Sequence, residues 1–446
     1  MSTAVEATKH WVTVWSASAQ GAYPIGSTIA QPDLSTAVPD AGLGLVNQSF
    51  RMLLKPGLWS TRFRLRISNQ FGKRPLQLRD VSLGLHLGGG ALAPGTRVEC
   101  PDLCVSAGAL TWTPVLEWPL LPSTPQLMLG RSLVFSAWVE GASGPVTWHA
   151  KAMTTSYLSC PGNSRAASSD SELGFPHTTT STFFIDALDA WLPTSVYALA
   201  AFGDSLTDGT ATTLNGHDRW TDVLQRELLA AARQDIAVIN AGIGGNQVCG
   251  PGPEAGPWRG GPAAIERLER DVLSLSGVRT VLWLEGINDF SDNGKAQAPT
   301  VIEAMTTAVQ RLRAQGVRVI GATVPSALGS TRPGHGSAIQ DAHRRAFNAE
   351  IRRGELFDDF ADLDHVLTDP VTGGLKAAFN GDSTIGDRGD GLHPNRAGHA
   401  AMARCILSSL QCTLYLTHST PDCAMTSAPM KKPCSTSCPT ACMVTT

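Results

Sequence analysis

The stretch that decides the fold runs from Val196 to Gly209 and reads VYALAAFGDSLTDG. Its first seven residues form a continuous apolar run, which is typical of a strand buried on both faces. Gly203 and Gly209 flank the turn that follows, and Ser205 lies between them at the start of the next segment. We expect this serine to be exposed to a ligand, since ligands gather at the carboxyl ends of strands in parallel sheets.

The same rhythm of apolar strand, turn and amphipathic helix repeats after residue 194. It predicts an α/β fold, with a parallel sheet and helices on both of its faces. The expected strands, each paired with the helix that follows it, are 196–202 with 220–232, 237–240 with 262–275, 280–284 with 299–315, and 317–324 with 340–351. A last helix over 396–410 closes this part of the chain.

The first 160 residues follow a different pattern, with short alternating segments rich in aromatic and turn residues. Arg62–Ser68 alternates polar and apolar side chains, as a half-buried strand does. Similar runs at 110–116, 132–139 and 146–155 are separated by proline and glycine turns, which predicts a sandwich of antiparallel sheets. Seven tryptophans here could stack on sugars of a glycan or form the core of the sandwich, namely Trp11, Trp15, Trp59, Trp112, Trp118, Trp138 and Trp148.

These patterns divide the chain into four expected segments. Residues 1–160 form a sandwich-like β-domain, and residues 195–412 form the α/β domain. Residues 161–194 are a linker and connecting segment, because the Ser/Gly/Asn-rich part of this stretch lacks an apolar period. Residues 413–446 form a Cys/Ser/Thr/Pro-rich tail that we expect to be disordered or linked by disulfides. A metal site on Cys434, Cys438 and Cys442 is the alternative, although their spacing differs from that of zinc sites.

The composition excludes several classes of protein. The 446 residues are 42% hydrophobic and 16% charged, which is enough apolar material for a sizeable core. The 35 Lys and Arg against 38 Asp and Glu give a formal net charge of -3, so nucleic acid is not an expected partner. No apolar stretch approaches the roughly 20 residues of a membrane helix. The N-terminus shows no signal peptide, so we expect a cytoplasmic protein unless a leader has been removed.

The sequence also provides a base for the serine. A hydroxyl is a weak nucleophile until a neighbouring group takes its proton, and His393 is the best candidate. Asp390 precedes His393 by three residues in the glycine-rich stretch Gly389–Asn395. One loop can therefore bring the carboxylate to one ring nitrogen while the other ring nitrogen faces Ser205. The alternative is an aspartate that caps the next helix beside a solvated histidine.

Other residues compete for these roles. The main rival pair is Asp362 with His365, which lacks the glycine-rich approach and the trailing Pro-Asn. The remaining histidines considered for the base are His335, His343 and His399. A second Gly-Asp-Ser at residues 381–383 follows no buried strand, and we interpret it as a loop that leads to Asp390.

Two further strand ends carry groups suited to acyl transfer, which needs hydrogen-bond donors aimed at a developing oxyanion. Residues 239–246 form a strand end that runs into glycines, and residues 284–290 contain an Asn-Asp pair. A glycine N–H and an asparagine amide can serve as such donors. A tight turn and a helix N-cap or Asx-turn are the respective alternatives. Motifs of dinucleotide-binding proteins, α/β-hydrolase elbows and zinc proteases do not occur.

Taken together, the four blocks resemble the SGNH hydrolases, also called the GDSL esterase/lipase family, in the order Ser, Gly, Asn and Asp/His. The resemblance covers residues 195–410 and rests on Ser205, Gly245, Asn288, Asp390 and His393. It implies a three-layer α/β/α, flavodoxin-like fold with Ser205 as nucleophile, His393 as base and Asp390 orienting the base. It also implies an oxyanion hole made by the N–H groups of Ser205 and Gly245 with the Asn288 amide.

Two stretches outside this region, residues 11–18 and 65–72, are similar to the N-terminal β-domain of a two-domain bacterial and fungal subgroup of these hydrolases. The resemblance implies ester hydrolysis through an acyl-enzyme, without a metal or other cofactor. Polysaccharide O-acetyl groups, acyl lipids and small esters are the alternative substrates. A glycan- or surface-binding protein with a silent α/β domain is the alternative from another class. Loops 248–261 and 326–337 are expected to shape the pocket.

Overall fold

The computed structural model describes residues 8–118, 125–250 and 258–417, with the side chains of 411–417 left out. The chain divides into a unit of residues 1–409 and a unit of residues 410–446. The predicted disordered tail begins at residue 413, but helix α7 (Arg396–Thr417) continues to Thr417, so the helix is longer than predicted. The rest of the tail, including the candidate metal site on its cysteines, lies outside the described residues. None of the helices within the described residues has the length and apolar character needed to cross a membrane.

The second half of the unit is built on a five-stranded parallel sheet, which confirms the predicted α/β fold. Its order is β18-β17-β19-β20-β21, so the chain reverses direction next to β17, as in flavodoxin-like folds. The strands span Ile236–Gly242, Tyr197–Gly203, Val278–Leu284, Arg318–Ala322 and Asp359–Ala361, respectively. The last of them, β21, was not predicted because three residues show no periodicity.

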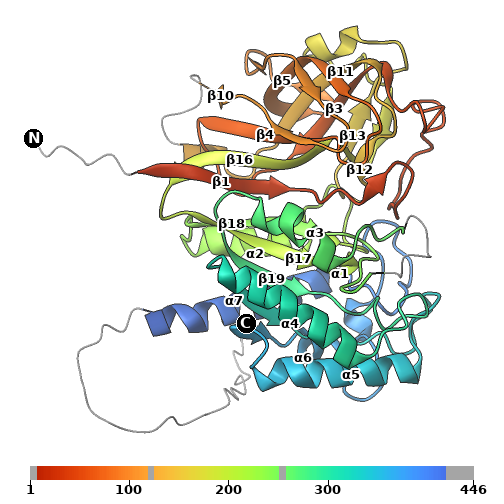
Figure 1. Ribbon diagram of the computed structural model, residues 1–446, viewed down its shortest axis with the longest axis vertical. Helices are drawn as coiled ribbons and strands as arrows, with labels where there is room; N and C mark the ends of the chain where they lie inside the picture. Colours follow the sequence, from red (N-terminus) through yellow and green to blue (C-terminus); the bar gives the residue numbers. More distant parts are fainter. Residues whose placement is uncertain (1–7, 119–124, 251–257, 418–446) are drawn as a thin grey trace, which may run out of the picture. The chain divides into compact units, whose positions relative to one another are not determined.

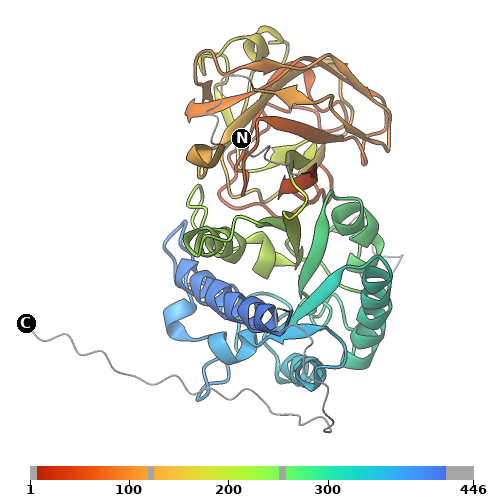
Figure 2. The ribbon, with the colours of Figure 1, turned by 90° about the vertical axis from the view of Figure 1, so that its left-hand side faces the viewer.

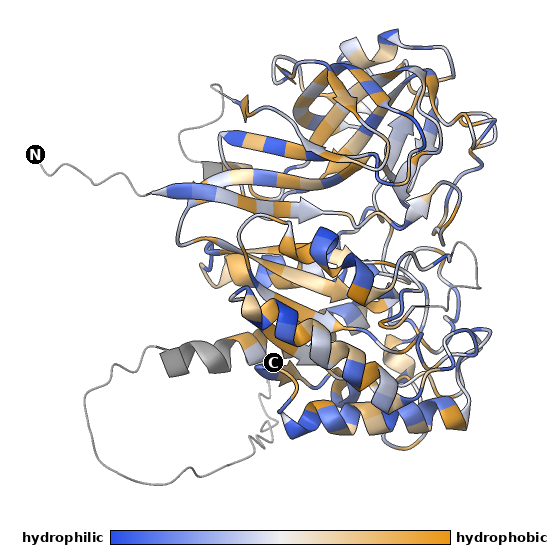
Figure 3. Cartoon of the chain, viewed as in Figure 1, coloured by the Kyte–Doolittle hydropathy of each residue, from blue (hydrophilic) through white to orange (hydrophobic). Residues whose placement is uncertain are grey.

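Helices cover both faces of this sheet (Figures 1 and 2). Helices α2 (Trp220–Ala230) and α7 lie on one face. Helices α3 (Ala264–Leu268), α4 (Ala298–Ala314) and α5 (Ala338–Arg353) lie on the other. Figure 3 shows the central strands mainly in hydrophobic colours and α5 largely in hydrophilic ones, as expected for a buried sheet under amphipathic helices. The predicted three-layer α/β/α arrangement is therefore confirmed.

The helix predicted over 262–275 differs in detail from the structure. The α-helix α3 ends at Leu268, and a π-helical turn continues it over Glu269–Leu273. Three charged residues of this segment, Arg267, Arg270 and Asp271, are buried. The wider π turn coincides with these inward-facing charged groups, and such turns often mark functional sites.

The first half of the unit is β-rich and antiparallel, as predicted. One sheet has the order β1-β16-β4-β10, with β9 paired to β4; the strands span Lys9–Ser16, Ile185–Pro193, Arg62–Ser68, Leu116–Glu117 and Leu110–Trp112. The second sheet has the order β14-β13-β3-β11-β5-β6, with β7 and β8 paired to β5; the strands span His177–Thr179, Ser156–Leu158, Val46–Leu54, Leu133–Ala142, Leu76–Gly88, Ala91–Leu92, Val98–Glu99 and Leu103–Val105. A small third sheet joins β15 (Thr182–Phe183), β12 (Thr147–His149) and β2 (Gly21–Ala22).

The segment predicted as a linker, residues 161–194, holds ordered strands in this structure. Strand β16 lies between β1 and β4 and pairs with both. The first six residues of this strand, starting at Ile185, are all buried, and they include Asp186 and Asp189. A strand with two buried aspartates does not show a simple apolar period, which explains why the sequence pattern missed it. The β-rich half extends to Pro193.

The tryptophans of the β-rich half divide into two groups. Trp59, Trp118 and Trp148 are buried in the core of this half. Trp11, Trp15, Trp112 and Trp138 are half-buried. The guanidinium of Arg64 lies over the rings of Trp11 and Trp112, 4.6 and 4.4 Å from their centroids. Stacking on sugars by the half-buried tryptophans stays a prediction.

Arg66 forms a buried ion pair within the β-rich half and also hydrogen-bonds the α/β half. Arg66 on β4 is 3% exposed, and its Nε lies 2.6 Å from Oδ1 of Asp186 on β16. The Nη1 and Nη2 groups of Arg66 donate to Ser274 Oγ at 2.8 Å and to the Arg270 carbonyl at 3.1 Å. Burial raises the pKa of Asp186, and the Arg66 charge opposes that rise. The β-rich half is thus bound through β4 to the segment that follows α3.

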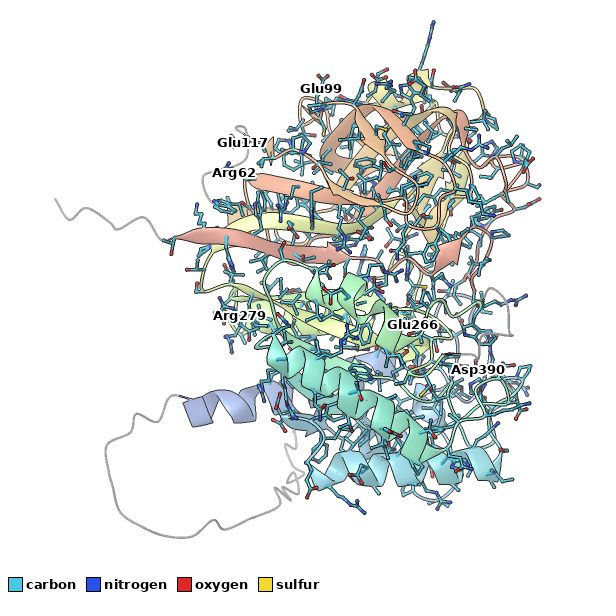
Figure 4. The ribbon with its side chains drawn as sticks, viewed as in Figure 1. Arg62, Glu99, Glu117, Glu266, Arg279 and Asp390 are labelled. Carbon is cyan, nitrogen blue, oxygen red and sulfur yellow. The ribbon has the colours of Figure 1, made fainter. Side chains whose placement is uncertain are left out.

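We predict that Arg66→Met lowers the free energy of unfolding by about 3–5 kcal/mol, because Asp186 stays buried without its counter-charge. The matched control is Arg62→Met on the same strand. Arg62 pairs with Glu117 at the surface, where both side chains are exposed (Figure 4), so its loss costs about 1 kcal/mol or less. Urea unfolding of both variants measures the difference, and equal effects would contradict the prediction.

Candidate active site

The position of Ser205 follows from the end of strand β17. The strand stops at Gly203, and Asp204 caps the short helix α1 (Ser205–Asp208) by accepting a hydrogen bond from the Leu206 N–H at 2.9 Å. A Cβ at Gly203 would lie 2.3 Å from the Leu284 carbonyl oxygen, so only glycine fits there. Ser205 is thereby held at the carboxyl edge of the sheet, where its side chain lines a cavity.

The structure brings Ser205, His393 and Asp390 into one chain of hydrogen bonds. The Ser205 Oγ lies 2.8 Å from His393 Nε2. The His393 Nδ1 lies 2.7 Å from Asp390 Oδ2. The other carboxylate oxygen, Oδ1, accepts the backbone N–H groups of Leu392 and His393, both at 2.9 Å. This geometry is that of a serine, a base and a group that orients the base.

Hydrogen bonds from Ser330 and Thr331 hold the loop that carries Asp390 in place. The Asp390 carbonyl accepts the Ser330 hydroxyl at 2.6 Å and the Thr331 N–H at 2.9 Å. Gly389 and Gly391 on either side have φ values of 72° and 75°, which side chains rarely adopt. These two glycines let the carboxylate turn inward while the chain continues toward His393. Asp390 is labelled in Figure 4 at the edge of the α/β half.

The electrostatics of the three residues favour a charged aspartate and a neutral histidine. The pKa of Asp390 is held far below its usual range: burial opposes this, but hydrogen bonds from His393 and the His393 charge outweigh it. Burial lowers the pKa of His393, Asp390 raises it, and the nearby charges of Lys151 and Arg332 lower it further. The net shift is downward, so His393 is mainly neutral near pH 7 and able to accept a proton.

The rival residues lie elsewhere. Asp362 caps helix α6 (Leu363–Leu367) and pairs with Arg352 at 2.7 Å, while His365 is exposed. His399 accepts the Trp220 N–H through Nδ1 at 3.1 Å and is buried in that role.

The structure also places His343 and the second Gly-Asp-Ser, both of which the sequence analysis considered. His343 stacks on Phe290 with ring centroids 6.2 Å apart. The second Gly-Asp-Ser forms a turn in which Asp382 Oδ1 accepts the N–H groups of Thr384 and Ile385. This confirms its interpretation as a loop.

The predicted oxyanion donors line the same cavity as Ser205. Among the described residues, neither the Ser205 N–H nor the Gly245 N–H has a protein acceptor. The Asn288 Nδ2 donates to the Asn246 carbonyl at 2.9 Å, which leaves one of its two hydrogens available. The Asn288 Oδ1 lies 3.2 Å from His335 Nε2, so the ring and the amide fix each other's orientation.

The charged residue that supports this loop, Arg267, was not singled out from the sequence. It is 1% exposed and donates to the carbonyls of Gly203 at 2.9 Å and Ala241 at 2.7 Å, which end strands β17 and β18. Its Nε donates to Asn246 Oδ1 at 2.7 Å. The Asn246 carbonyl in turn accepts a hydrogen bond from the Asn288 amide. The Arg267 guanidinium therefore links both strands to the loop that contains Gly245. An arginine between Glu266 and Leu268 on an amphipathic helix gives no sequence signal of this role.

Asp289 has a related role that the sequence left open. Its two carboxylate oxygens accept the N–H groups of Val248 at 2.9 Å and Cys249 at 3.0 Å. Burial raises the pKa of Asp289 to about 6, against these hydrogen bonds. The residue therefore anchors the loop that follows Gly245 and does not cap a helix.

The cavity has a volume of about 430 Å³ and draws residues from both halves of the unit. The predicted pocket loops contribute Trp258, Arg259, Arg332 and His335 among their described residues. The β-rich half contributes Ser27, Thr28, Ile29 and Lys151, which the sequence did not indicate because they follow no motif. Within the described residues, no three His, Cys, Asp or Glu side chains gather as they would around a metal ion.

We predict that the His393 imidazole titrates below the ordinary histidine value of 6.5, because burial disfavours its cation. Imidazole NMR of the histidine-labelled protein measures the midpoint, with His393→Gln to assign the signal. A midpoint above 6.5 would show that the Asp390 charge, which raises the pKa, outweighs burial.

Comparison with known proteins gives a family for the α/β half. Residues 201–401 match the model of the GDSL-like Lipase/Acylhydrolase family. No curated protein matches the chain.

Solved structures similar to the chain include a lipase/acylhydrolase from Enterococcus faecalis, with 22% identity and a TM-score of 0.38 over 49% of this chain and 97% of that one. The native aryl esterase of M. smegmatis has 16% identity and a TM-score of 0.39 over 49% of this chain and 99% of that one. A carbohydrate acetylesterase, Est24 from Sinorhizobium meliloti, has 14% identity and a TM-score of 0.37 over 49% of this chain and 99% of that one. By this match, the α/β half of the chain belongs to the GDSL-like lipase/acylhydrolase family, and the protein is a carboxylic ester hydrolase.

Proposed function

We propose that this enzyme cleaves its ester through Ser205, with His393 as general base and Asp390 as the residue that orients the base. The observation that carries the proposal is the hydrogen-bond chain from Ser205 Oγ to His393 Nε2 at 2.8 Å and from His393 Nδ1 to Asp390 at 2.7 Å. His393 takes the serine proton as Oγ attacks the ester carbonyl, and Asp390 stabilises the imidazolium that forms. His393 then returns the proton to the departing alkoxide.

The second half of the reaction restores the enzyme. The acyl group is now on Ser205 Oγ, and a water molecule replaces the departed alcohol beside His393. The histidine takes a proton from this water, the hydroxide attacks the acyl carbonyl, and the proton returns to Ser205 as the carboxylic acid leaves.

The negative charge that develops on the carbonyl oxygen in both steps needs hydrogen-bond donors that are already in place. We assign this role to the N–H groups of Ser205 and Gly245 and to the Asn288 amide. The lack of protein acceptors for the two backbone groups supports the assignment, since their hydrogens are available to a ligand. Arg267 and Asn246 act as positioning residues for this loop.

The cavity favours an ester with a small acyl group over an acyl lipid. Its described lining includes the polar or charged side chains of Lys151, Arg259, Arg332, Asn288 and Asn293. Apolar side chains are fewer in this lining, namely Ile29, Trp258, Pro333 and Leu392. A long acyl chain would displace water from these polar groups without replacing its hydrogen bonds. A small, polar alcohol or acid part suits them better.

The proposal predicts that Ser205→Ala lowers kcat for 4-nitrophenyl acetate by at least about 10³-fold, because the nucleophile is removed. The wild type should keep its activity in a buffer with a chelator and prefer the acetate over the decanoate. The release of 4-nitrophenolate measures each rate. Full activity of Ser205→Ala would rule out the assigned nucleophile, and a preference for decanoate would rule out the small acyl group.

The oxyanion assignment predicts that Asn288→Ala lowers kcat by about 10²–10³-fold with little change in KM, because the lost hydrogen bond is strongest in the transition state. Asn293→Ala is the matched control, since Asn293 lines the same cavity but is exposed. Steady-state kinetics of both variants on 4-nitrophenyl acetate measures the changes in kcat and in KM separately. Equal effects of the two substitutions, or a change confined to KM, would contradict the assignment.

A further inference from the structure

Lys151 is a buried cation that the proposed reaction does not use. It follows strand β12 in the β-rich half, and its side chain reaches the cavity beside Ser205 with the residue only 3% exposed. The Nζ group donates to the Thr210 hydroxyl, which lines the same cavity. An ammonium group has three hydrogens to donate, so the described residues leave two of them without an acceptor.

No carboxylate forms an ion pair with Lys151 among the described residues, although Asp208, Asp204 and Asp390 all oppose the lowering of its pKa. Asp208 is the carboxylate with the strongest influence on it, but no ion pair joins the two within the described residues. Asp208 already binds His149 Nε2 at 3.0 Å through one oxygen and the Gly244 N–H at 2.7 Å through the other. Burial lowers the pKa of Lys151 and Arg332 lowers it further, whereas Asp208 opposes these effects. The site thus has a place for a negative charge that the protein itself does not fill.

Two more cations stand at the rim of the cavity. Arg259 and Arg332 line it and are exposed, and neither guanidinium forms an ion pair or hydrogen bond among the described residues. No Asp or Glu belongs to the described lining. The cavity therefore combines one buried and two exposed positive groups with a proposed nucleophile, in a protein whose formal net charge is -3.

We infer that the ester cleaved at Ser205 carries a carboxylate, and that Lys151 binds this group with Arg259 and Arg332 at the rim. The inference rests on the proposed function and adds the class of substrate to it. The neutral part of the ester reaches Ser205, while the anionic part lies on the side of the cavity formed by the β-rich half. A charge-assisted hydrogen bond from a buried ammonium is among the stronger polar contacts in proteins, and so can decide between substrates.

The test compares pairs of esters that differ mainly in one charge. The pair with the charge in the alcohol part is 4-acetoxybenzoate against 4-acetoxybenzamide, and the pair with the charge in the acyl part is monophenyl adipate against phenyl hexanoate. For the wild type, we expect kcat/KM to be about tenfold or more higher for the anionic member of at least one pair. The pair that shows the preference identifies the part of the ester that carries the charge.

Two substitutions assign the preference to its residues. Lys151→Met keeps the apolar part of the side chain without its ammonium group and should reduce the ratio of anionic to neutral kcat/KM to near one, whereas Lys151→Arg should retain part of it. Arg332→Gln, at an exposed position, should reduce the ratio by less. Lys73→Met is the control, because Lys73 is exposed and does not line the cavity, and it should leave the ratio unchanged.

Each outcome decides the inference. A wild-type ratio near one for both pairs would overturn it, even if Ser205-dependent hydrolysis is intact. Equal losses on both members of a pair in Lys151→Met, with an unchanged ratio in Arg332→Gln, would also overturn it and assign Lys151 to the oxyanion or to folding. If Lys151→Met does not fold, the ratio in the Arg259→Gln/Arg332→Gln double variant decides. Hydrolysis of all esters by Ser205→Ala would instead mean that the proposed function has failed.

Discussion

The site depends on one buried guanidinium. Arg267 donates to the carbonyls that end β17 and β18 and to the side chain of Asn246, and its charge is balanced by Asp271 at 3.1 Å. A buried arginine without these acceptors would be costly, so its presence requires the two strand ends and the loop to lie in one arrangement. That arrangement presents the N–H groups of Ser205 and Gly245 and the amide of Asn288 to the cavity.

The β-rich half forms part of the wall of the candidate active-site cavity. It closes one side of the cavity with Ser27, Thr28, Ile29 and Lys151. It is also bound to the α/β half by buried polar contacts, such as Arg270 Nη2 to the Ala19 carbonyl at 2.8 Å and Ser16 Oγ to the Asn240 carbonyl at 2.8 Å. These contacts join the π-helical turn after α3 and strand β18 to the β-rich half. In our account, the α/β half performs the chemistry and the β-rich half selects the ester.

Much of this could be predicted from the sequence because period and motif are local properties. The apolar strands and amphipathic helices after residue 194 follow such periods, and Ser205, Asp390 and His393 stand in recognisable blocks. Strand β16 was missed because its buried Asp186 and Asp189 interrupt the apolar pattern, and their partners Arg66 and Arg64 lie more than a hundred residues away. Lys151 was missed for a similar reason: a lone lysine has no local signature, and only the docking of the two halves brings it to the cavity.

The most direct test of the central claim is to label the active serine. A fluorophosphonate forms a bond from its phosphorus to an activated serine oxygen and releases fluoride, and mass spectrometry of the intact protein and its peptides locates the adduct. Our account predicts a single adduct on Ser205, formed in the wild type and slowed strongly in His393→Gln. An adduct on another residue, or unimpaired ester hydrolysis by protein that the reagent does not label, would contradict it.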